Sequence, residues 1–129
     1  MNYLGYHQTF WIYRRIVEET GGGEGVRDEG LLRSALARPQ TTFGGQELYP
    51  TLFEKAAALA ESLVKNHPFL DGNKRMALVC LRTFLKMNGS HVTAPQEEKV
   101  KLIMQIATKE VTVEDVAKWL AKHTRRVPS

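Results

Sequence analysis

Helical periodicity, repeated along nearly the whole chain, constrains the fold more than any other feature of the sequence. In the segment TFWIYRRIVEET, the apolar residues Ile12, Tyr13, Ile16 and Val17 recur at the spacing of one helix face. Comparable patterns run through GLLRSALARP, TLFEKAAALAESLVKN, NKRMALVCLRTFLKMN, EEKVKLIMQIA and VEDVAKWLAKH. We find no convincing strand alternation. The sequence therefore predicts an all-α, single-domain bundle of about six helices over residues 1–129.

Residues that favour helix ends flank most of these segments. Gly21 is expected to end the first helix in a left-handed conformation. The expected N-terminal caps of the second, third, fifth and sixth helices are Asp28, Thr51 with Glu54, Thr93 with Gln96, and Thr112. The fourth helix, NKRMALVCLRTFLKMN, is expected to be the central buried one, because apolar residues nearly encircle it. The tail TRRVPS is expected to fray.

The composition fits a globular domain without disulfides. Lysine and arginine number 18 against 14 aspartate and glutamate residues, and this net charge of +4 is compatible with an anionic ligand, a nucleic acid or an acidic protein partner. The single cysteine, Cys80, lies in an apolar run and cannot form an internal disulfide. No segment has the roughly 18 apolar residues of a membrane span, and the N-terminus lacks a signal-peptide pattern. We therefore expect a cytoplasmic protein without membrane association.

One segment departs from helical periodicity. Residues 41–50, within QTTFGGQELYP, are polar around the central pair Gly44–Gly45 and include the aromatic residues Phe43 and Tyr49. A glycine pair between two short arms favours a loop or a small β-hairpin. We expect this segment to be the only extended element.

The stretch HPFLDGNKR, residues 67–75, concentrates reactive side chains between two predicted helices. Pro68 disfavours helical dihedral angles at His67, so the third helix is expected to end near Asn66 and a loop to begin there. The next helix starts after Gly72. Its free backbone N–H groups and positive dipole end attract an anion, and Gly72 lets the backbone approach that anion closely.

The side chains of this stretch suit phosphate chemistry. Lys74 and Arg75 add positive charge, and Arg75 offers a planar fork for phosphate oxygens. His67 is the natural proton acceptor, because an imidazole titrates near working pH. Asp71 could hold Mg²⁺ against the phosphates or orient the accepting hydroxyl. Together these groups fit the transfer of a phosphoryl group to an alcohol.

Each residue also has a simpler interpretation. A histidine at a helix end is often a cap or a packed polar residue, and Asp71 or Asn73 could merely cap the following helix. Lys74 and Arg75 could form a solvated first turn, although cations there oppose the helix dipole. The concentration of these groups in one short stretch favours a functional site. The run GGGEG, residues 21–25, is a weak candidate for a phosphate-binding loop, because no GK[ST] follows it.

HPFLDGNKR resembles the signature of the Fic/Doc superfamily. Its lysine, where Fic enzymes usually have glycine, makes it similar to the death-on-curing (Doc) branch. The resemblance extends over about half the chain, from GVRDEG to FLKMNG. It implies an all-helical toxin of a type II toxin–antitoxin system. Such a toxin is a protein kinase that uses ATP and Mg²⁺, transfers the γ-phosphate to a threonine of elongation factor Tu, and so arrests translation.

The resemblance also implies a role for each residue of the motif. His67 would be the base that activates the target hydroxyl, Asp71 the carboxylate that orients the metal or the hydroxyl, and Phe69 a buried anchor. The implied phosphate clamp consists of Gly72, Asn73, Lys74 and Arg75. The implied flap, which would pair with the target through strand-like backbone contacts, contains Phe43, Gly44, Gly45 and Tyr49. Met76 is a departure, since Doc relatives usually have threonine there.

Lys74 bears on which group is transferred. In Fic enzymes the glycine leaves a backbone anion hole that seats the inner phosphates, and AMP is transferred. A lysine side chain would crowd that hole, and the Doc resemblance implies a reversed nucleotide that presents its γ-phosphate. AMP transfer and a non-catalytic interaction module remain alternatives. Direct nucleic-acid binding is not expected, because the cations are scattered rather than aligned on one helix.

A partner protein is a further expectation. The single match to [ST]xxxE[GN], the internal inhibitory pattern of many Fic proteins, is TGGGEG at residues 20–25, a glycine-rich run that is not expected to form an inhibitory helix. By resemblance, control would come from an antitoxin of the prevents-host-death type, whose C-terminal segment folds into an amphipathic helix in an apolar groove near the flap and the first helices. The aromatic candidates for this groove, each more commonly half-buried than exposed, are Phe10, Trp11, Phe43 and Tyr49.

Overall fold

A computed structural model gives the fold of residues 1–21 and 25–127. This part of the chain forms six α-helices, namely α1 (Tyr6–Thr20), α2 (Glu29–Ala37), α3 (Leu52–Asn66), α4 (Asn73–Met87), α5 (Gln96–Ala107) and α6 (Val113–Lys122). The expected all-α fold is confirmed. None of these helices has the length and the apolar character that crossing a bilayer requires. Residues 22–24, the middle of the run GGGEG, lie outside the described residues.

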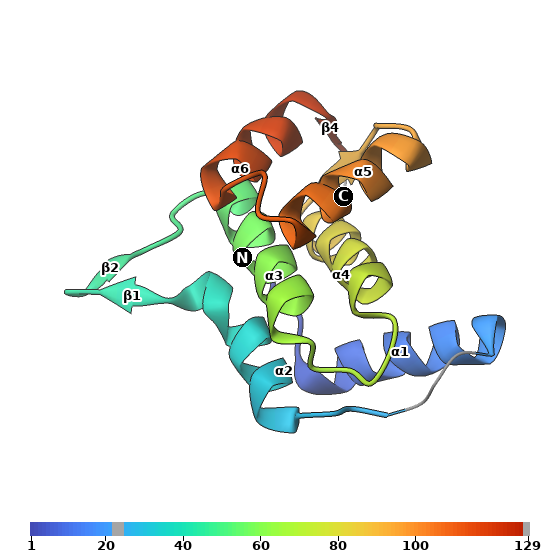
Figure 1. Ribbon diagram of the computed structural model, residues 1–129. Helices are drawn as coiled ribbons and strands as arrows, with labels where there is room; N and C mark the ends of the chain where they lie inside the picture. Colours follow the sequence, from blue (N-terminus) through green and yellow to red (C-terminus); the bar gives the residue numbers. More distant parts are fainter. Residues whose placement is uncertain (22–24, 128–129) are drawn as a thin grey trace.

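Helices α3 and α4 form the centre of the bundle, with α1 and α2 toward one end and α5 and α6 toward the other (Figure 1). Helix α4 is central, as predicted, but it shares the centre with α3, which is the more buried of the two. Helix α3 buries nine of its 15 side chains, whereas α4 buries seven of 15. The cause is the alanine-rich run Ala56–Ala60, whose small side chains allow neighbouring elements to approach α3 closely from several sides.

Most of the predicted helix ends are confirmed. Gly21 has a φ of 66° and ends α1. The carboxylate of Asp28 accepts a hydrogen bond from the Leu31 N–H at 2.9 Å and caps α2. The hydroxyl of Thr51 accepts from the backbone N–H of Glu54 at the start of α3. Thr112 caps α6 through a reciprocal capping box.

The predicted cap of α5 is wrong. Helix α5 begins directly after Pro95 and has no side-chain cap. The backbone N–H and the hydroxyl of Thr93 instead donate to the carbonyl oxygen of His123, at 2.7 Å and 3.0 Å. Thr93 therefore joins the end of α6 to the segment before α5, a contact that its local sequence does not reveal.

A second small sheet was not expected. Strand β3 (Ser90–Val92) pairs antiparallel with β4 (Thr124–Arg126), and His91 lies opposite Arg125. The hydrogen bond from the Val127 N–H to the Gly89 carbonyl oxygen extends the ladder. The predictions of a single extended segment and of a frayed tail are therefore wrong for residues 124–127, and residues 128–129 lie outside the described residues. Each strand is too short to show an alternating pattern, and its partner is distant in sequence.

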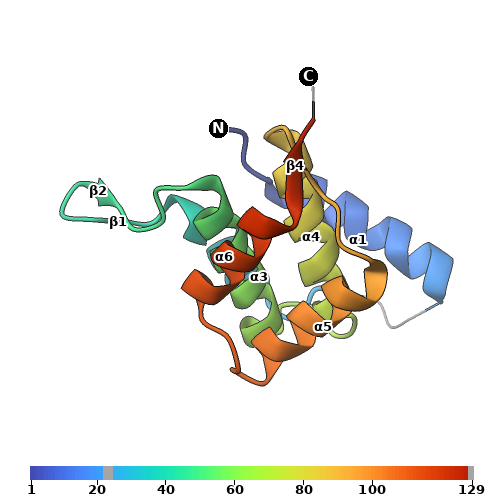
Figure 2. The same ribbon diagram turned by 90° about the horizontal axis from the view of Figure 1, so that it is seen from above.

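The segment 41–50 is the predicted small hairpin. Strands β1 (Thr42–Phe43) and β2 (Gln46–Glu47) pair antiparallel, after a short 3-10 helix, η1 (Arg38–Gln40). Gly44 and Gly45 have φ values of 58° and 81°, the left-handed conformations that a tight two-residue hairpin turn requires. Two views at right angles show the hairpin as an arm that projects from the helices (Figures 1 and 2).

The root of the arm is fixed by two cationic side chains, Lys55 and Arg38. The ammonium group of Lys55, whose side chain is almost wholly buried, lies 2.8 Å from the Glu47 carboxylate and donates to the Pro39 carbonyl oxygen at 3.1 Å. The guanidinium of Arg38 donates to the Tyr49 hydroxyl at 2.9 Å and pairs with Glu61. Burial alone would lower the pKa of Arg38, but the hydrogen bonds with Tyr49 and Glu61 outweigh it and raise this pKa. The tip of the arm has no such attachment among the described residues.

We expect Glu47→Ala to lower the free energy of unfolding by about 1 kcal/mol, the low end of the cost of leaving a buried polar group unsatisfied. The loss stays small because Lys55 keeps its bond to Pro39 and because the Glu47 side chain is half-exposed. Urea unfolding measures this difference. The matched control is Glu110→Ala, at an exposed turn after α5, which should be nearly neutral. Equal losses in both variants would contradict a role for the Lys55 contact.

Candidate active site at the start of helix α4

The site is built on a short loop between the two central helices. Helix α3 ends at Asn66, as predicted, and α4 begins at Asn73. His67 ends α3 with φ 49° and ψ 55°, which is a left-handed conformation rather than the extended one that a following proline favours. Gly72, with a φ of 76°, turns the chain into α4. The loop thus changes direction at both of its ends.

Two side chains close this loop from within. The carboxamide of Asn73 accepts from the backbone N–H of Phe69 and donates to the carbonyl oxygen of Phe69, both at 3.0 Å. One carboxylate oxygen of Asp71 accepts from the backbone N–H of Gly72 at 2.8 Å. The side chain of Asn73 therefore shapes the loop. The group of Asn73 that can bind an anion is its backbone N–H, at the first turn of α4.

Phe69 is buried, in agreement with its expected role as an anchor. Its side chain is 1% exposed, and its ring stacks on Tyr13 of α1 with 4.4 Å between the centroids. An isolated β-bridge joins Phe69 to Val26. A stacked and fully buried ring of this size holds the loop against α1.

The first turn of α4 combines free donors with positive charge. Gly72, its N-cap, provides no side-chain hydrogen bond, and this turn, all of which is described, contains no acidic residue. The backbone N–H groups of Asn73, Lys74 and Arg75 have no partner within the helix. Lys74 and Arg75 are exposed, and two cations at the positive end of a helix are unfavourable without an anion. The free N–H groups and the two cations of this turn therefore favour a negatively charged group beside it.

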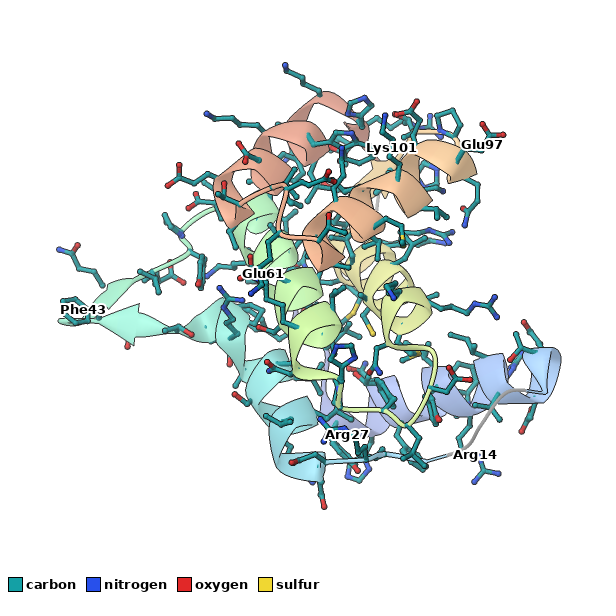
Figure 3. All side chains as sticks on the ribbon, viewed as in Figure 1. Arg14, Arg27, Phe43, Glu61, Glu97 and Lys101 are labelled. Carbon is teal, nitrogen blue, oxygen red and sulfur yellow. The ribbon has the colours of Figure 1, made fainter. Side chains whose placement is uncertain are left out.

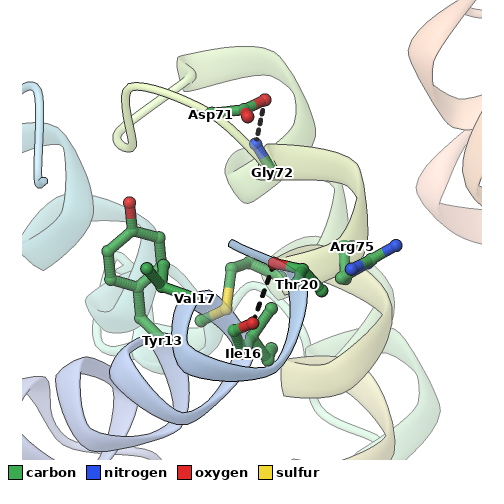
Figure 4. A pocket seen from close by; sticks show the side chains of 8 residues that line it. Tyr13, Ile16, Val17, Thr20, Asp71, Gly72 and Arg75 are labelled. Atoms are coloured by element: carbon green, nitrogen blue, oxygen red, sulfur yellow. Dashed lines mark hydrogen bonds between the residues drawn. The ribbon is translucent and has the colours of Figure 1, made fainter. Parts of the chain in front are cut away.

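A pocket of about 400 Å³ opens between α1 and the start of α4 (Figure 4). This volume lies within the range of small-molecule sites. The residues that line it are Tyr13, Ile16, Val17 and Thr20 on one side and Asp71, Gly72, Arg75 and Met76 on the other. Three predicted site residues, Asp71, Gly72 and Arg75, thus share one cavity. Met76 is buried and contributes an apolar part of the wall.

The remaining predicted residues lie outside this lining. His67 and Lys74 are exposed near the two ends of the loop. Phe43, at the tip of the hairpin arm, is 83% exposed, and Gly44 and Gly45 beside it are also exposed. Figure 3 shows Phe43 pointing away from the helices. Tyr49, in contrast, is half-buried at the root of the arm against Arg38.

A second segment, which no pattern in the sequence indicates, supports the loop. The backbone N–H of Arg27 donates to the Pro68 carbonyl oxygen at 2.7 Å, and the Leu70 N–H donates to the Gly25 carbonyl oxygen at 3.1 Å. The Tyr13 hydroxyl accepts from the Gly25 N–H at 2.9 Å. In this segment, the sequence patterns that predict structure are the glycine Gly25 and the helix cap Asp28. Neither indicates contact with residues about forty positions later in the chain.

The family of the chain follows from its similarity to known proteins. Residues 3–85 match the Fic/DOC family, a span that contains the hairpin arm, the loop and nearly all of α4. The chain belongs to the Fic/Doc family. The predicted membership is thereby confirmed.

Two relatives of this Fic/Doc chain differ in how much of it they cover. Toxin Doc of Mycolicibacterium smegmatis is 44% identical over 103 residues, which make up 78% of this chain and 79% of the relative. Protein kinase doc of Escherichia phage P1 is 29% identical over 122 residues, 95% of each chain. The similarity to these proteins therefore includes both the loop and the helices around it.

Residues 1–21 and 25–127 contain neither a metal site built from several protein ligands nor a reactive cysteine. No group of three or more histidine, cysteine, aspartate or glutamate side chains is placed to hold a metal ion. Cys80 is fully buried, and this burial raises the pKa of its thiol to about 12. A protonated, inaccessible thiol is not a nucleophile.

Proposed function

We propose that this protein is a toxin with protein kinase activity, which transfers the γ-phosphate of ATP to a protein hydroxyl. The observation that supports this most is the uncapped first turn of α4, which carries Lys74 and Arg75 and borders a pocket large enough for part of a nucleotide. The names of the two relatives, a toxin and a protein kinase, agree with this proposal. AMP transfer and a non-catalytic role are the alternatives.

In the proposed reaction His67 accepts the proton of the target hydroxyl. The hydroxyl oxygen forms a bond to the γ-phosphorus as the bond between this phosphorus and the bridging oxygen breaks, and ADP leaves. The first-turn N–H groups of α4, with Lys74 and Arg75, stabilise the negative charge on the phosphates. Since no P-loop or protein-kinase signature is present in the sequence, positioning and charge at one helix start supply the catalysis.

Asp71 is the proposed ligand for Mg²⁺. Its carboxylate is exposed at the pocket, with one oxygen bonded to the Gly72 N–H. Mg²⁺ commonly takes one or two carboxylates together with substrate phosphates and water, so a lone aspartate beside a phosphate site fits this ion. When bound with ATP, Mg²⁺ supplies positive charge against the phosphate oxygens.

The proposed target is a threonine of elongation factor Tu, held by the hairpin arm. The β1–β2 ladder has two strands, so each strand has an outer edge whose backbone groups can pair with an extended segment. The exposed Phe43 and the bare glycine turn allow such a segment to approach closely.

The three candidate activities predict different results with labelled ATP. Purified protein is incubated with elongation factor Tu and with ATP labelled at either the γ- or the α-phosphate. Label from the γ-position on the factor supports the kinase, and mass spectrometry then identifies the modified threonine. Label from the α-position supports AMP transfer. Neither label on the factor supports the interaction module.

We also propose an antitoxin partner, which binds an apolar groove between α1 and the end of α4. This groove, of about 740 Å³, is lined by Leu4, His7, Gln8, Trp11, Ile12, Thr83, Lys86 and Met87. The expected partial burial is wrong for Trp11, which is 62% exposed, and for Phe43. Phe10 and Tyr49 are half-buried, as expected. Phe43 and Tyr49 belong to the arm and do not line this groove.

The surroundings of this groove favour an acidic amphipathic helix as the partner segment. Lys86 lies in the lining, Arg14 and Arg15 lie in an adjoining hollow with Phe10 and Trp11, and the Arg15 guanidinium stands 5.1 Å from the centre of the Trp11 ring. Cations around an apolar floor attract acidic side chains on either side of an apolar helix face.

Trp11→Ala is expected to weaken antitoxin binding by about 2 to 4 kcal/mol, as truncation of a central interface tryptophan does. Titration calorimetry with the antitoxin measures the loss. Phe43→Ala, the matched control on the arm, should leave the affinity unchanged.

Co-expression tests the partner segment itself: an antitoxin that lacks its C-terminal half should fail to restore growth. Full neutralisation by that truncated antitoxin would contradict the helix-in-groove proposal.

A further inference from the structure

His67 occupies a backbone conformation that requires support from outside the loop. Its φ of 49° and ψ of 55° place it in the left-handed region, where the β-carbon of an L-residue is crowded by the backbone. Glycine would adopt this conformation readily, but glycine has no imidazole. The position therefore combines a reactive side chain with a disfavoured backbone, and neighbouring groups must stabilise it.

Arg27 supplies that support through its side chain. Its Nε donates to the carbonyl oxygen of His67 at 2.7 Å, and its Nη2 donates to the carbonyl oxygen of Asn66 at 2.8 Å. These carbonyls lie at the C-terminal end of α3, where they lack helical partners and where the helix dipole favours a cation. The planar guanidinium fork can satisfy both at once, which a lysine cannot do in the same geometry.

The backbone beside Arg27 holds the next carbonyl of the loop. The N–H groups of Arg27 and Asp28 donate to the Pro68 carbonyl oxygen at 2.7 Å and 3.1 Å. Three consecutive carbonyls, those of Asn66, His67 and Pro68, are therefore bound by two adjacent residues. The peptide planes on both sides of the His67 α-carbon are fixed by this arrangement, because each contributes a bound carbonyl.

The supporting segment is itself anchored before it meets the loop. The Asp28 side chain caps α2, and the Tyr13 hydroxyl bonds to both the N–H and the carbonyl oxygen of Gly25. In Figure 3, Arg27 lies at the end of α3 where the chain enters the loop. The segment that carries Arg27 is therefore held in place on both sides of this residue.

We propose that Arg27 is a positioning residue, which holds His67 in its left-handed conformation and so fixes the imidazole relative to the start of α4. The inference rests on the proposed role of His67 as the base. Arg27 does not line the pocket between α1 and α4, and its Nε and Nη2 groups are bound to carbonyls, so it acts through His67 and not on the nucleotide.

The test compares Arg27→Gln and Arg27→Lys with Arg33→Gln. Arg33 is an exposed arginine of α2 that pairs with Glu29, so its variant is a matched charge control. For Arg27→Gln we expect kcat to fall about 10- to 100-fold, since a displacement of about 1 Å at a reacting group can cost 10²-fold. Arg27→Lys, which keeps the charge but loses the fork, should lie between Arg27→Gln and the wild type. The KM for ATP should change less than about twofold, because the first turn of α4 is untouched.

A second measurement does not depend on catalysis. In two-dimensional NMR spectra, the backbone and ring signals of His67 should shift or broaden in both Arg27 variants and stay unchanged in Arg33→Gln. Folded Arg27 variants with wild-type kcat and unchanged His67 signals would overturn the proposal. A raised KM for ATP at constant kcat would also overturn it, by making Arg27 part of nucleotide binding. If the wild type transfers no phosphate at all, the kinase proposal fails, and the NMR comparison alone decides whether Arg27 positions His67.

Discussion

Replacing His67 with alanine is expected to lower the rate of phosphoryl transfer about 10²- to 10⁴-fold, the usual contribution of a general base. The loss should appear in kcat, measured with γ-labelled ATP, and expression of the variant should no longer arrest growth. The fold should persist, because the exposed imidazole leaves no cavity when it is removed. Circular dichroism and thermal unfolding verify that the variant is folded.

His67→Asn separates the loss of the base from a change in the backbone. Asparagine tolerates the left-handed conformation better than most residues, so this variant should keep the loop geometry and still lose the activity. His91→Ala, at an exposed histidine of β3, serves as the control and should transfer phosphate at the wild-type rate. A folded His67→Ala protein with the wild-type rate would remove this histidine from the mechanism.

Features with a local physical cause could be predicted from the sequence. Asp28, Thr51 and Thr112 act as caps because each side chain bonds to a backbone group only a few residues away. The same applies to the turn at Gly44–Gly45, whose left-handed angles only glycine adopts freely. The loop from His67 to Gly72 was also placed correctly, since the proline at its start and the glycine at its end limit the helices on both sides.

Features that depend on distant segments could not be predicted. Thr93 has the residues of a capping box after it, yet its donors bind the end of α6, thirty residues away in the chain. The β3–β4 ladder and the contacts of Arg27 with residues 66–68 have the same origin. In each case one partner carries no pattern of its own, so only the folded chain brings the two together. The support of the loop was therefore not predicted, although the position of the loop between α3 and α4 was.

Lys74→Gly is expected to lower γ-phosphoryl transfer about 10²-fold, comparable to the loss of one group that stabilises charge in the transition state. Lys74 is the second residue of α4 and is exposed beside the first-turn N–H groups. Its removal takes one cation from the phosphate site and leaves space over the backbone donors. If the lysine side chain is what prevents the inner phosphates from binding there, transfer of α-label to the target should rise from the background. Parallel assays with the two labels measure both effects.

Lys74→Ala shows whether the lysine serves an anion or the stability of the fold. Both variants should lose γ-transfer, but without nucleotide Lys74→Ala should be more stable than the wild type by about 0.3–1 kcal/mol, because a cation near the positive end of a helix is unfavourable. A gain in unfolding free energy together with a loss of transfer would indicate that the lysine is there for an anion and not for the fold. The glycine variant should lack this gain, since glycine in a helix costs up to about 1 kcal/mol relative to alanine. Full γ-transfer by either variant would disprove the proposed role of Lys74, and α-transfer by the wild type would reverse the proposed orientation of the nucleotide.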